Sequence, residues 1–176
     1  MMLVWHYTIA DRWASILQDG LIRPALPLEK LTTEQLEQIE RIIATGEGED
    51  FALSEAPAVW FSKRSTWEPT ATKGKMDNGV RRNATLAEMM RKGPLVRIGV
   101  ERDGLYTWLE HRKLSGIRPE TAKGLVRAAA KAGASPGDWF VHYGPVPRDR
   151  WVRIERSTDG KAWMEETGVL SATPSL

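Results

Sequence analysis

The sequence predicts a single α+β domain built around a mixed β-sheet. Its 176 residues are close to the usual size of one domain. Short segments rich in β-branched and aromatic residues are interspersed with amphipathic helical segments, in the order strand, helices, strand, helix, strand, helices and three strands. Hydrophobic residues make up 41% and charged residues 27%, which is typical of a globular protein and not of a disordered one.

The first elements of the chain have clear boundary signals. Residues 3–7 are rich in aromatic and β-branched side chains and predict a strand. Thr8 is expected to cap the following helix, whose apolar residues recur at helical spacing, and Gly20 is expected to end it. Residues 31–45 predict a second amphipathic helix. This helix and the polar loop after it are interpreted as an insertion at about 28–55, because one such helix cannot bury its own apolar stripe.

The middle of the chain alternates strands with a long polar stretch. Residues 58–62 predict the second core strand and residues 95–100 another. Between them, residues 63–83 are polar and basic and are expected to form a long loop, which in a compact domain is usually functional or mobile. A short helix is expected over residues 85–92.

The last part of the chain predicts two helices and three strands. The helices are expected over residues 105–114 and 119–131, the second opened by a proline at its first turn. The strands are expected over residues 139–143 and 151–155, followed by a hairpin return over residues 161–164. We expect one domain over residues 1–167 and a flexible tail at 168–176.

Composition excludes several classes of protein. Lys and Arg total 25 against 23 acidic residues, a balance unlike that of a dedicated duplex-DNA binder. Basic residues do gather in residues 63–102, for which an ordinary solvated face is the simplest interpretation. No apolar run is long enough to span a membrane and the N-terminus lacks the features of a signal peptide. With cysteine absent, a cytoplasmic location is expected.

The sequence also lacks the motifs of the common enzyme classes. The 3 histidines are His6, His111 and His142, which fall on separate elements without the local spacing of zinc ligands, so no metal site is expected. No dinucleotide-binding glycine fingerprint, phosphate-binding Walker loop or serine nucleophile elbow is present. A cysteine nucleophile is excluded because the chain has none.

Three short motifs remain, and their order and spacing resemble those of a known superfamily. They are His6-Tyr7-Thr8 with the following Ile16-Leu17-Gln18-Asp19-Gly20-Leu21-Ile22, then Trp60-Phe61-Ser62, and finally Asp138-Trp139-Phe140-Val141. In these blocks the chain resembles the ADP-ribosyltransferase superfamily, which includes bacterial toxins that modify DNA and also RNA 2′-phosphotransferases. The resemblance implies a mainly antiparallel split β-sheet with flanking helices, and NAD as a consumed substrate.

The resemblance also implies roles for particular residues. His6 would hold a ribose of NAD with help from Thr8 or Ser62, and Arg64 or Lys63 would contact the pyrophosphate. Aromatic faces for stacking on nicotinamide would come from among Tyr7, Trp60, Phe61 and Trp67.

The catalytic carboxylate is the point of departure from the family. The family places its catalytic glutamate at the position that matches Asp138, whose side chain is shorter by one carbon–carbon bond, about 1.5 Å. A misplacement of about 1 Å can lower a rate by about a hundredfold. Glu68 is therefore the best substitute among the other carboxylates, and Glu155 is the next.

The sequence thus predicts transfer of ADP-ribose from NAD to a protein or nucleic-acid acceptor, as in a toxin of a bacterial or phage conflict system. Two alternatives stay open. One is RNA 2′-phosphotransferase chemistry on a similar scaffold. The other is a non-catalytic module that uses its tryptophans and the basic loop to bind nucleic acid or a partner protein. For His6 taken alone, a half-buried structural histidine is the simpler interpretation.

Overall fold

The computed structural model describes residues 2–24, 32–34, 36–37, 40–41, 56–168 and 170. Most of the predicted insertion at about 28–55 and most of the predicted tail at 168–176 lie outside these residues. The described part is an α+β domain, as the sequence predicts, and all of its strand pairings are antiparallel. None of its helices combines the length and the apolar character needed to cross a membrane.

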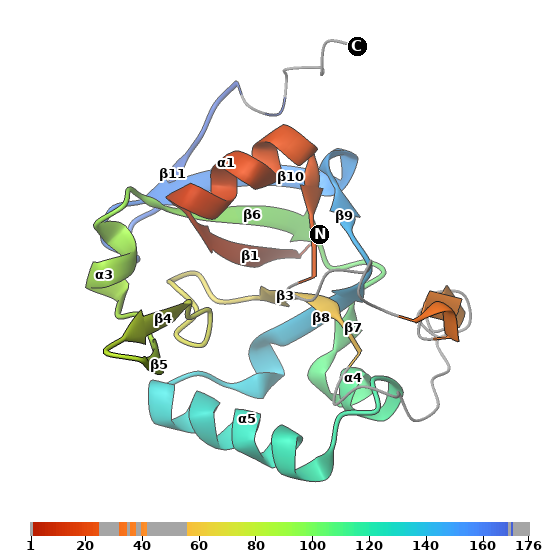
Figure 1. The fold of residues 1–176 in the computed structure, drawn as a ribbon. Helices are drawn as coiled ribbons and strands as arrows, with labels where there is room; N and C mark the ends of the chain where they lie inside the picture. The colour runs from red at the N-terminus through yellow and green to blue at the C-terminus, as the bar shows by residue number, and fades with distance from the viewer. Residues whose placement is uncertain are drawn as a thin grey trace.

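One sheet runs through the middle of the domain (Figure 1). Its strands are β1 (Leu3–Ile9), β3 (Ala58–Ser62), β6 (Leu95–Glu101), β7 (Tyr106–Thr107), β8 (Trp139–Tyr143), β10 (Trp151–Ser157) and β11 (Met164–Glu165). They lie side by side in the order β11-β10-β6-β1-β3-β8-β7. Strand β2 (Leu21–Ile22) pairs separately with β9 (Val146–Pro147), and β4 (Gly74–Asp77) pairs with β5 (Val80–Asn83). The five core strands predicted from the sequence are all present.

The β4–β5 hairpin lies within residues 63–83, which the sequence analysis treated as a loop. That prediction is wrong for the second half of the stretch. Asn78 and Gly79 have φ angles of 48° and 80°, the left-handed conformation that closes a two-residue hairpin turn. Asn-Gly is the strongest short-range hairpin signal in a sequence, so the signal was present but was masked by the polar composition around it.

Helices α1 (Ala10–Asp19), α3 (Leu86–Met90), α4 (Trp108–Leu114) and α5 (Pro119–Ala132) flank the sheet. Two of them begin with a complete capping box, in which a threonine and a glutamate three residues later exchange hydrogen bonds with each other's backbone. Thr8 does not cap α1, contrary to prediction. It pairs with Val96 inside the β1–β6 ladder, so the strand continues to Ile9 before the helix begins.

The two faces of the sheet are covered by different elements. On one face, alternate residues of the central strands pack with Trp13 of α1, among them Val4, Ile98 and Ile154. On the other face, Trp5 and Tyr7 pack with Trp67, Met89 and Leu95. The tryptophans expected in the core, Trp5, Trp139 and Trp151, are 8%, 6% and 5% exposed, which confirms that prediction. Helices α4 and α5 lie beyond β8 and β7, at the end of the molecule away from α1 (Figure 1).

A buried ion pair holds the second face together. Nε of Arg97 on β6 donates to Oε2 of Glu155 on β10 at 2.6 Å, and the two residues are each 7% exposed. The Arg97 guanidinium lies between the rings of Trp5 and Trp163, 4.0 Å and 4.4 Å from their centroids. Its Nη1 donates to the carbonyl oxygen of Ser65 at 2.6 Å. Glycine at position 99 makes room for this stack, since a Cβ there would lie 2.8 Å from the Trp5 ring.

The sheet opens between β1 and β3. Strand β1 is paired with β6 along its whole length, but its pairing with β3 is confined to Trp5 and Ser62. Beyond that point the strands diverge, and the His6 side chain spans the gap, with Nδ1 3.0 Å from the carbonyl oxygen of Trp60. The opening separates the β10–β6–β1 part of the sheet from the β3–β8–β7 part, and the candidate site lies there.

Candidate functional site

A cavity of about 680 Å³ lies at the opening between β1 and β3. This volume is within the range of about 300–1,000 Å³ that small-molecule sites usually have. The two strands contribute residues from Trp5 to Thr8 and from Ala58 to Ser62. The remaining walls come from the polar side of α1, from β2, from residues 68–73, and from Leu125 and Trp139. Segments far apart in the sequence therefore share one cavity.

His6 lies on the wall formed by β1. A carbonyl oxygen only accepts hydrogen bonds, so the contact between Nδ1 and the Trp60 carbonyl places the proton on Nδ1. Burial, and after it the charge of Lys73, lowers the pKa of His6 from 6.5 to about 4, although the bond to Trp60 acts in the opposite direction. At neutral pH the ring is therefore uncharged. Its Nε2 is left as an acceptor for a ligand hydroxyl.

Glu68 lines the same cavity from the loop that follows β3 and is 4% exposed. The Ser62 hydroxyl donates to its Oε2 at 2.8 Å, and the Thr70 hydroxyl donates to its Oε1 at 2.7 Å. The Thr70 backbone N–H is 3.3 Å from the same Oε1. A buried carboxylate that is orientated from both oxygens is held in one position, which is what a group facing a developing positive charge requires. The sequence analysis named Glu68 and Ser62, but not the contact between them.

The cavity lining also contains Arg12 and Lys73, as well as Arg23, which pairs with Asp19 at 3.4 Å. Burial, and then the nearby charge of Arg12, lowers the pKa of Lys73. Within the described residues neither the Arg12 nor the Lys73 side chain has a hydrogen bond or an ion pair, which is unusual for cations that line a largely apolar cavity. An anionic ligand would supply the missing counter-charge.

Neither Arg12 nor Lys73 was predicted from the sequence as a site residue. Arg12, Ser15, Ile16 and Asp19 line the cavity together, and their spacing is that of one helix face. That periodicity was available in the sequence, although only the fold shows that this face borders the opening. Nothing in the sequence around Lys73 distinguishes it from the other basic residues of its segment.

Tyr7 and Trp67 are used for packing on the other face of the sheet. The Tyr7 ring meets Trp67 and Trp163 edge-on, with centroids 5.4 Å and 5.8 Å away. Its hydroxyl lies 2.6 Å and 2.8 Å from the carbonyl oxygens of Arg64 and Thr66, and burial raises its pKa to about 12. Tyr7 contributes to the cavity wall, whereas Trp67 is not among the lining residues. Neither ring is free to stack on a ligand, because Tyr7 is only 4% and Trp67 only 7% exposed.

The other predicted binding residues divide into two groups. Thr8, Trp60, Phe61 and Ser62 line the cavity. Arg64 does not, because its Nη1 donates to the Gly133 carbonyl oxygen at 3.0 Å on the outside of the molecule. Phe61 lies edge-on to the His6 ring, with centroids 6.0 Å apart. Trp60 is half-buried among Trp108, His111 and Trp139 and is the more open of the two rings.

Asp138 lies next to the cavity but not in its wall. Its carbonyl oxygen accepts from the Lys63 backbone N–H at 3.0 Å, and its Oδ1 is 3.2 Å from Nζ of Lys63. Residue 139, the next along the chain, pairs with Ser62 and lines the cavity. Glu155 is further away, since it is buried in the pair with Arg97 on the other face of the sheet. Of the carboxylates that the sequence analysis considered, Glu68 alone lines the cavity.

Comparisons with protein-family models, with curated proteins and with solved structures find no match to this chain. Function has to be inferred from the site itself. Within the described residues, no group of three or more His, Asp or Glu side chains is placed to hold a metal ion. The cavity lining offers an uncharged imidazole, a fixed carboxylate, two cations without a partner among the described residues, and aromatic surface.

The lowered pKa of His6 predicts a pH effect on stability. Between about pH 4 and pH 6.5 the unfolded chain binds a proton at His6 that the folded chain excludes, so the free energy of unfolding rises with pH across this window. Urea unfolding of the wild type and of His6→Gln, at a series of pH values, should show a stability difference that changes across the window and is constant above it. The pKa of His142 is also lowered, but His142 is present in both proteins, so its contribution to the pH dependence cancels in the difference. A difference that does not vary with pH would contradict the prediction.

Proposed function

We propose that the cavity binds NAD and that the protein transfers ADP-ribose from it to a protein or nucleic-acid acceptor. One observation carries the proposal: His6, Ser62 and Glu68, which come from separate segments of the chain, line one cavity together with two cations that have no partner among the described residues. A dinucleotide presents the matching groups, namely ribose hydroxyls, a pyrophosphate and a flat aromatic ring.

The residues suit the chemistry of this transfer. The bond between the ribose C1′ and the nicotinamide nitrogen breaks with its electron pair leaving on nicotinamide, and positive charge develops on the sugar. The Glu68 carboxylate, held by Ser62 and Thr70, is placed to stabilise that charge. The acceptor then bonds to C1′ and loses its proton. Binding in a fixed orientation by the remaining groups lowers the entropic part of the barrier.

Each remaining group has a role in binding. His6 Nε2 accepts from a ribose hydroxyl, since its Nδ1 is committed to Trp60. Arg12 and Lys73 face the pyrophosphate, in place of the Arg64 and Lys63 that the sequence suggested. The half-buried ring of Trp60 offers the stacking surface for nicotinamide.

A transfer assay tests the proposal. The purified protein is incubated with NAD that carries a label on its adenylate. Cell protein, DNA and RNA are each added as acceptor in a separate reaction. Label is expected on one acceptor class, with free nicotinamide released in equal amount, and His6→Ala should abolish both signals while it remains folded. Binding of NAD with neither nicotinamide release nor label transfer would support a non-catalytic module. No binding of NAD at millimolar concentration would overturn the proposal.

A further inference from the structure

The exposed side of α4 and α5 carries the molecule's excess of positive charge. Between residues 107 and 133 the basic residues are Arg112, Lys113, Arg118, Lys123, Arg127 and Lys131, against Glu110 and Glu120. All of these basic side chains are exposed, and none forms an ion pair or a side-chain hydrogen bond within the described residues. These basic and acidic residues give the stretch a net charge of +4, while the whole chain carries +2.

The basic stretch that stands out in the sequence, residues 63–102, is different. Many of its cations are neutralised within the protein. Arg82 forms ion pairs with Asp77 at 2.9 Å and with Glu88 at 2.6 Å, and Lys92 pairs with Asp11 at 2.8 Å. Arg97 is buried with Glu155. Only the tertiary structure shows which cations are paired, and that those of α4 and α5 are exposed without an ion pair among the described residues.

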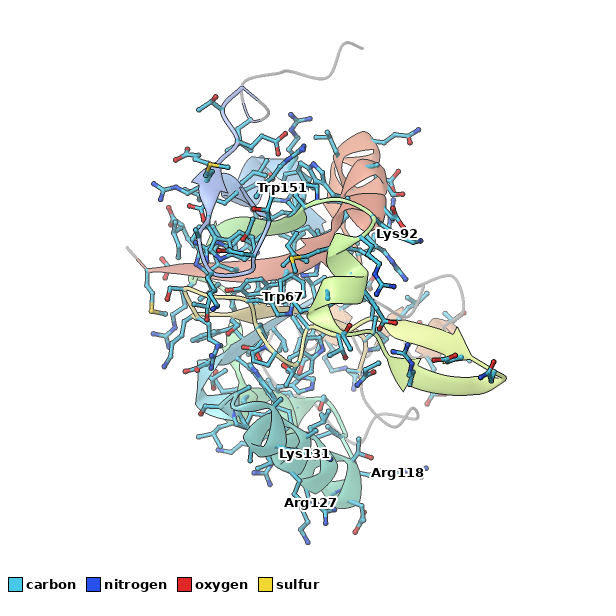
Figure 2. The ribbon with its side chains drawn as sticks, turned by 90° about the vertical axis from the view of Figure 1, so that its left-hand side faces the viewer. Trp67, Lys92, Arg118, Arg127, Lys131 and Trp151 are labelled. Carbon is cyan, nitrogen blue, oxygen red and sulfur yellow. The ribbon has the colours of Figure 1, made fainter. Side chains whose placement is uncertain are left out.

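The residue spacing along helix α5 gives it one buried apolar face and one exposed basic face. Its buried positions, Ala122 and Ala129, fall on one side together with Leu125, which reaches the cavity. On the opposite side, Lys123, Arg127 and Lys131 follow at intervals of four residues, about 6 Å apart along the axis. Figure 2 shows Arg127 and Lys131 on the outer side of this helix, with Arg118 at its end, away from the sheet. A hollow lined by Arg112, Lys123 and Arg127 joins α4 to the same surface.

We propose that this basic face, formed by Arg112, Lys113, Arg118, Lys123, Arg127 and Lys131, docks the phosphate backbone of duplex DNA. Regularly spaced, unpaired cations suit a regular polyanion, whose condensed counterions are released on binding. The exposed large apolar residues on these two helices are Leu109 and Val126, which are aliphatic. Trp108 is 5% exposed and offers no ring for stacking. A surface without aromatic platforms favours a duplex over an unpaired strand.

The shape of α5 favours DNA over RNA. Between its outward cations the exposed positions carry small side chains, among them Ala128 and Ala130. Such a slim helix fits the major groove of B-form DNA, about 12 Å wide, whereas the deep and narrow major groove of an RNA duplex excludes it. The proposal stands apart from the proposed function, because DNA docking on α5 requires neither NAD nor the cavity.

The test is DNA binding without NAD, measured by fluorescence anisotropy with a labelled duplex of mixed sequence over a range of salt concentrations. We expect the triple variant Lys123→Gln, Arg127→Gln, Lys131→Gln to bind at least about tenfold more weakly than the wild type. The plot of log affinity against log salt should also become less steep by about 2.7, which corresponds to three lost phosphate contacts. The substitutions are all on exposed positions, and thermal unfolding checks that the fold is unchanged.

The matched control is Lys92→Gln, Arg153→Gln, Lys161→Gln, which removes the same charge from exposed sites elsewhere. We expect it to change the affinity by less than about twofold, because distant charges are screened by salt. Three results would overturn the proposal: no binding of duplex DNA by the wild type at low salt, an equal loss in both triple variants, or tighter binding of single-stranded DNA or duplex RNA of the same length. Each of them leaves the NAD transfer assay unaffected.

Discussion

Replacing Glu68 with glutamine is expected to lower the rate of ADP-ribosyl transfer by at least about a hundredfold. The substitution keeps the size of the side chain and one oxygen that can accept from Thr70, while the amide NH2 can donate to the Ser62 hydroxyl. It removes the negative charge that faces the developing positive charge on the ribose. Removal of one fixed electrostatic group from a site of this kind typically costs about a hundredfold to a thousandfold in rate. Release of labelled nicotinamide under single-turnover conditions measures the effect.

The matched control for Glu68→Gln is Asp138→Asn. Asp138 occupies the position where the family resemblance expects the carboxylate, but it pairs with Lys63 and does not line the cavity. We expect Asp138→Asn to retain most of the activity, and both variants to bind NAD about as well as the wild type. Full activity in Glu68→Gln together with loss in Asp138→Asn would assign the catalytic role to Asp138 instead. Unfolding curves of both variants separate catalytic loss from loss of fold.

Breaking the buried ion pair between Arg97 and Glu155 is expected to cause the largest loss in the free energy of unfolding. In Arg97→Met, Glu155 is left buried without its main counter-charge, because the nearest other cation, Arg153, is 3.7 Å away and exposed. Removing one partner of a buried pair typically costs about 3–5 kcal/mol, a large part of the stability of a domain. The contacts with the rings of Trp5 and Trp163 are lost as well. Urea unfolding followed by tryptophan fluorescence measures the change.

The double variant Arg97→Met, Glu155→Leu distinguishes the charge from the packing. Two apolar side chains of similar volume leave no buried charge, so we expect the double variant to recover most of the lost free energy of unfolding. If it is no more stable than Arg97→Met, the loss comes from the hydrogen bond to Ser65 and the aromatic stack, and not from an unpaired carboxylate.

Local sequence signals predicted most of the elements. The core strands and the two helices that begin with threonine-glutamate capping boxes follow from patterns within a few residues. The errors occurred where local and tertiary preferences compete. Thr8 has the properties of a helix cap, but its place in the β1–β6 ladder extends the strand beyond it. Tyr106 and Thr107 were expected in a helix, yet they pair with β8, so α4 starts at Trp108.

The candidate site was predictable only in part. His6 and Ser62 stand in recognisable motifs, and both line the cavity. Arg12 and Lys73 carry no motif, since their significance comes from facing the same space as His6. Asp138 and Arg64 were selected by resemblance and position in the chain. The structure places both of them in contacts outside the cavity.

The sequence by itself determined the class of the fold, the identity of the core strands and the presence of His6 and Ser62 on two of them. Periodicity and turn chemistry act over a few residues, so they can be read along the chain. Only the tertiary structure decided that β1 and β3 separate after one pair, that Glu68 lines the cavity between them, and that Lys123, Arg127 and Lys131 are exposed on α5. These depend on which distant side chains come within a few ångströms of one another, and no local pattern encodes such distances.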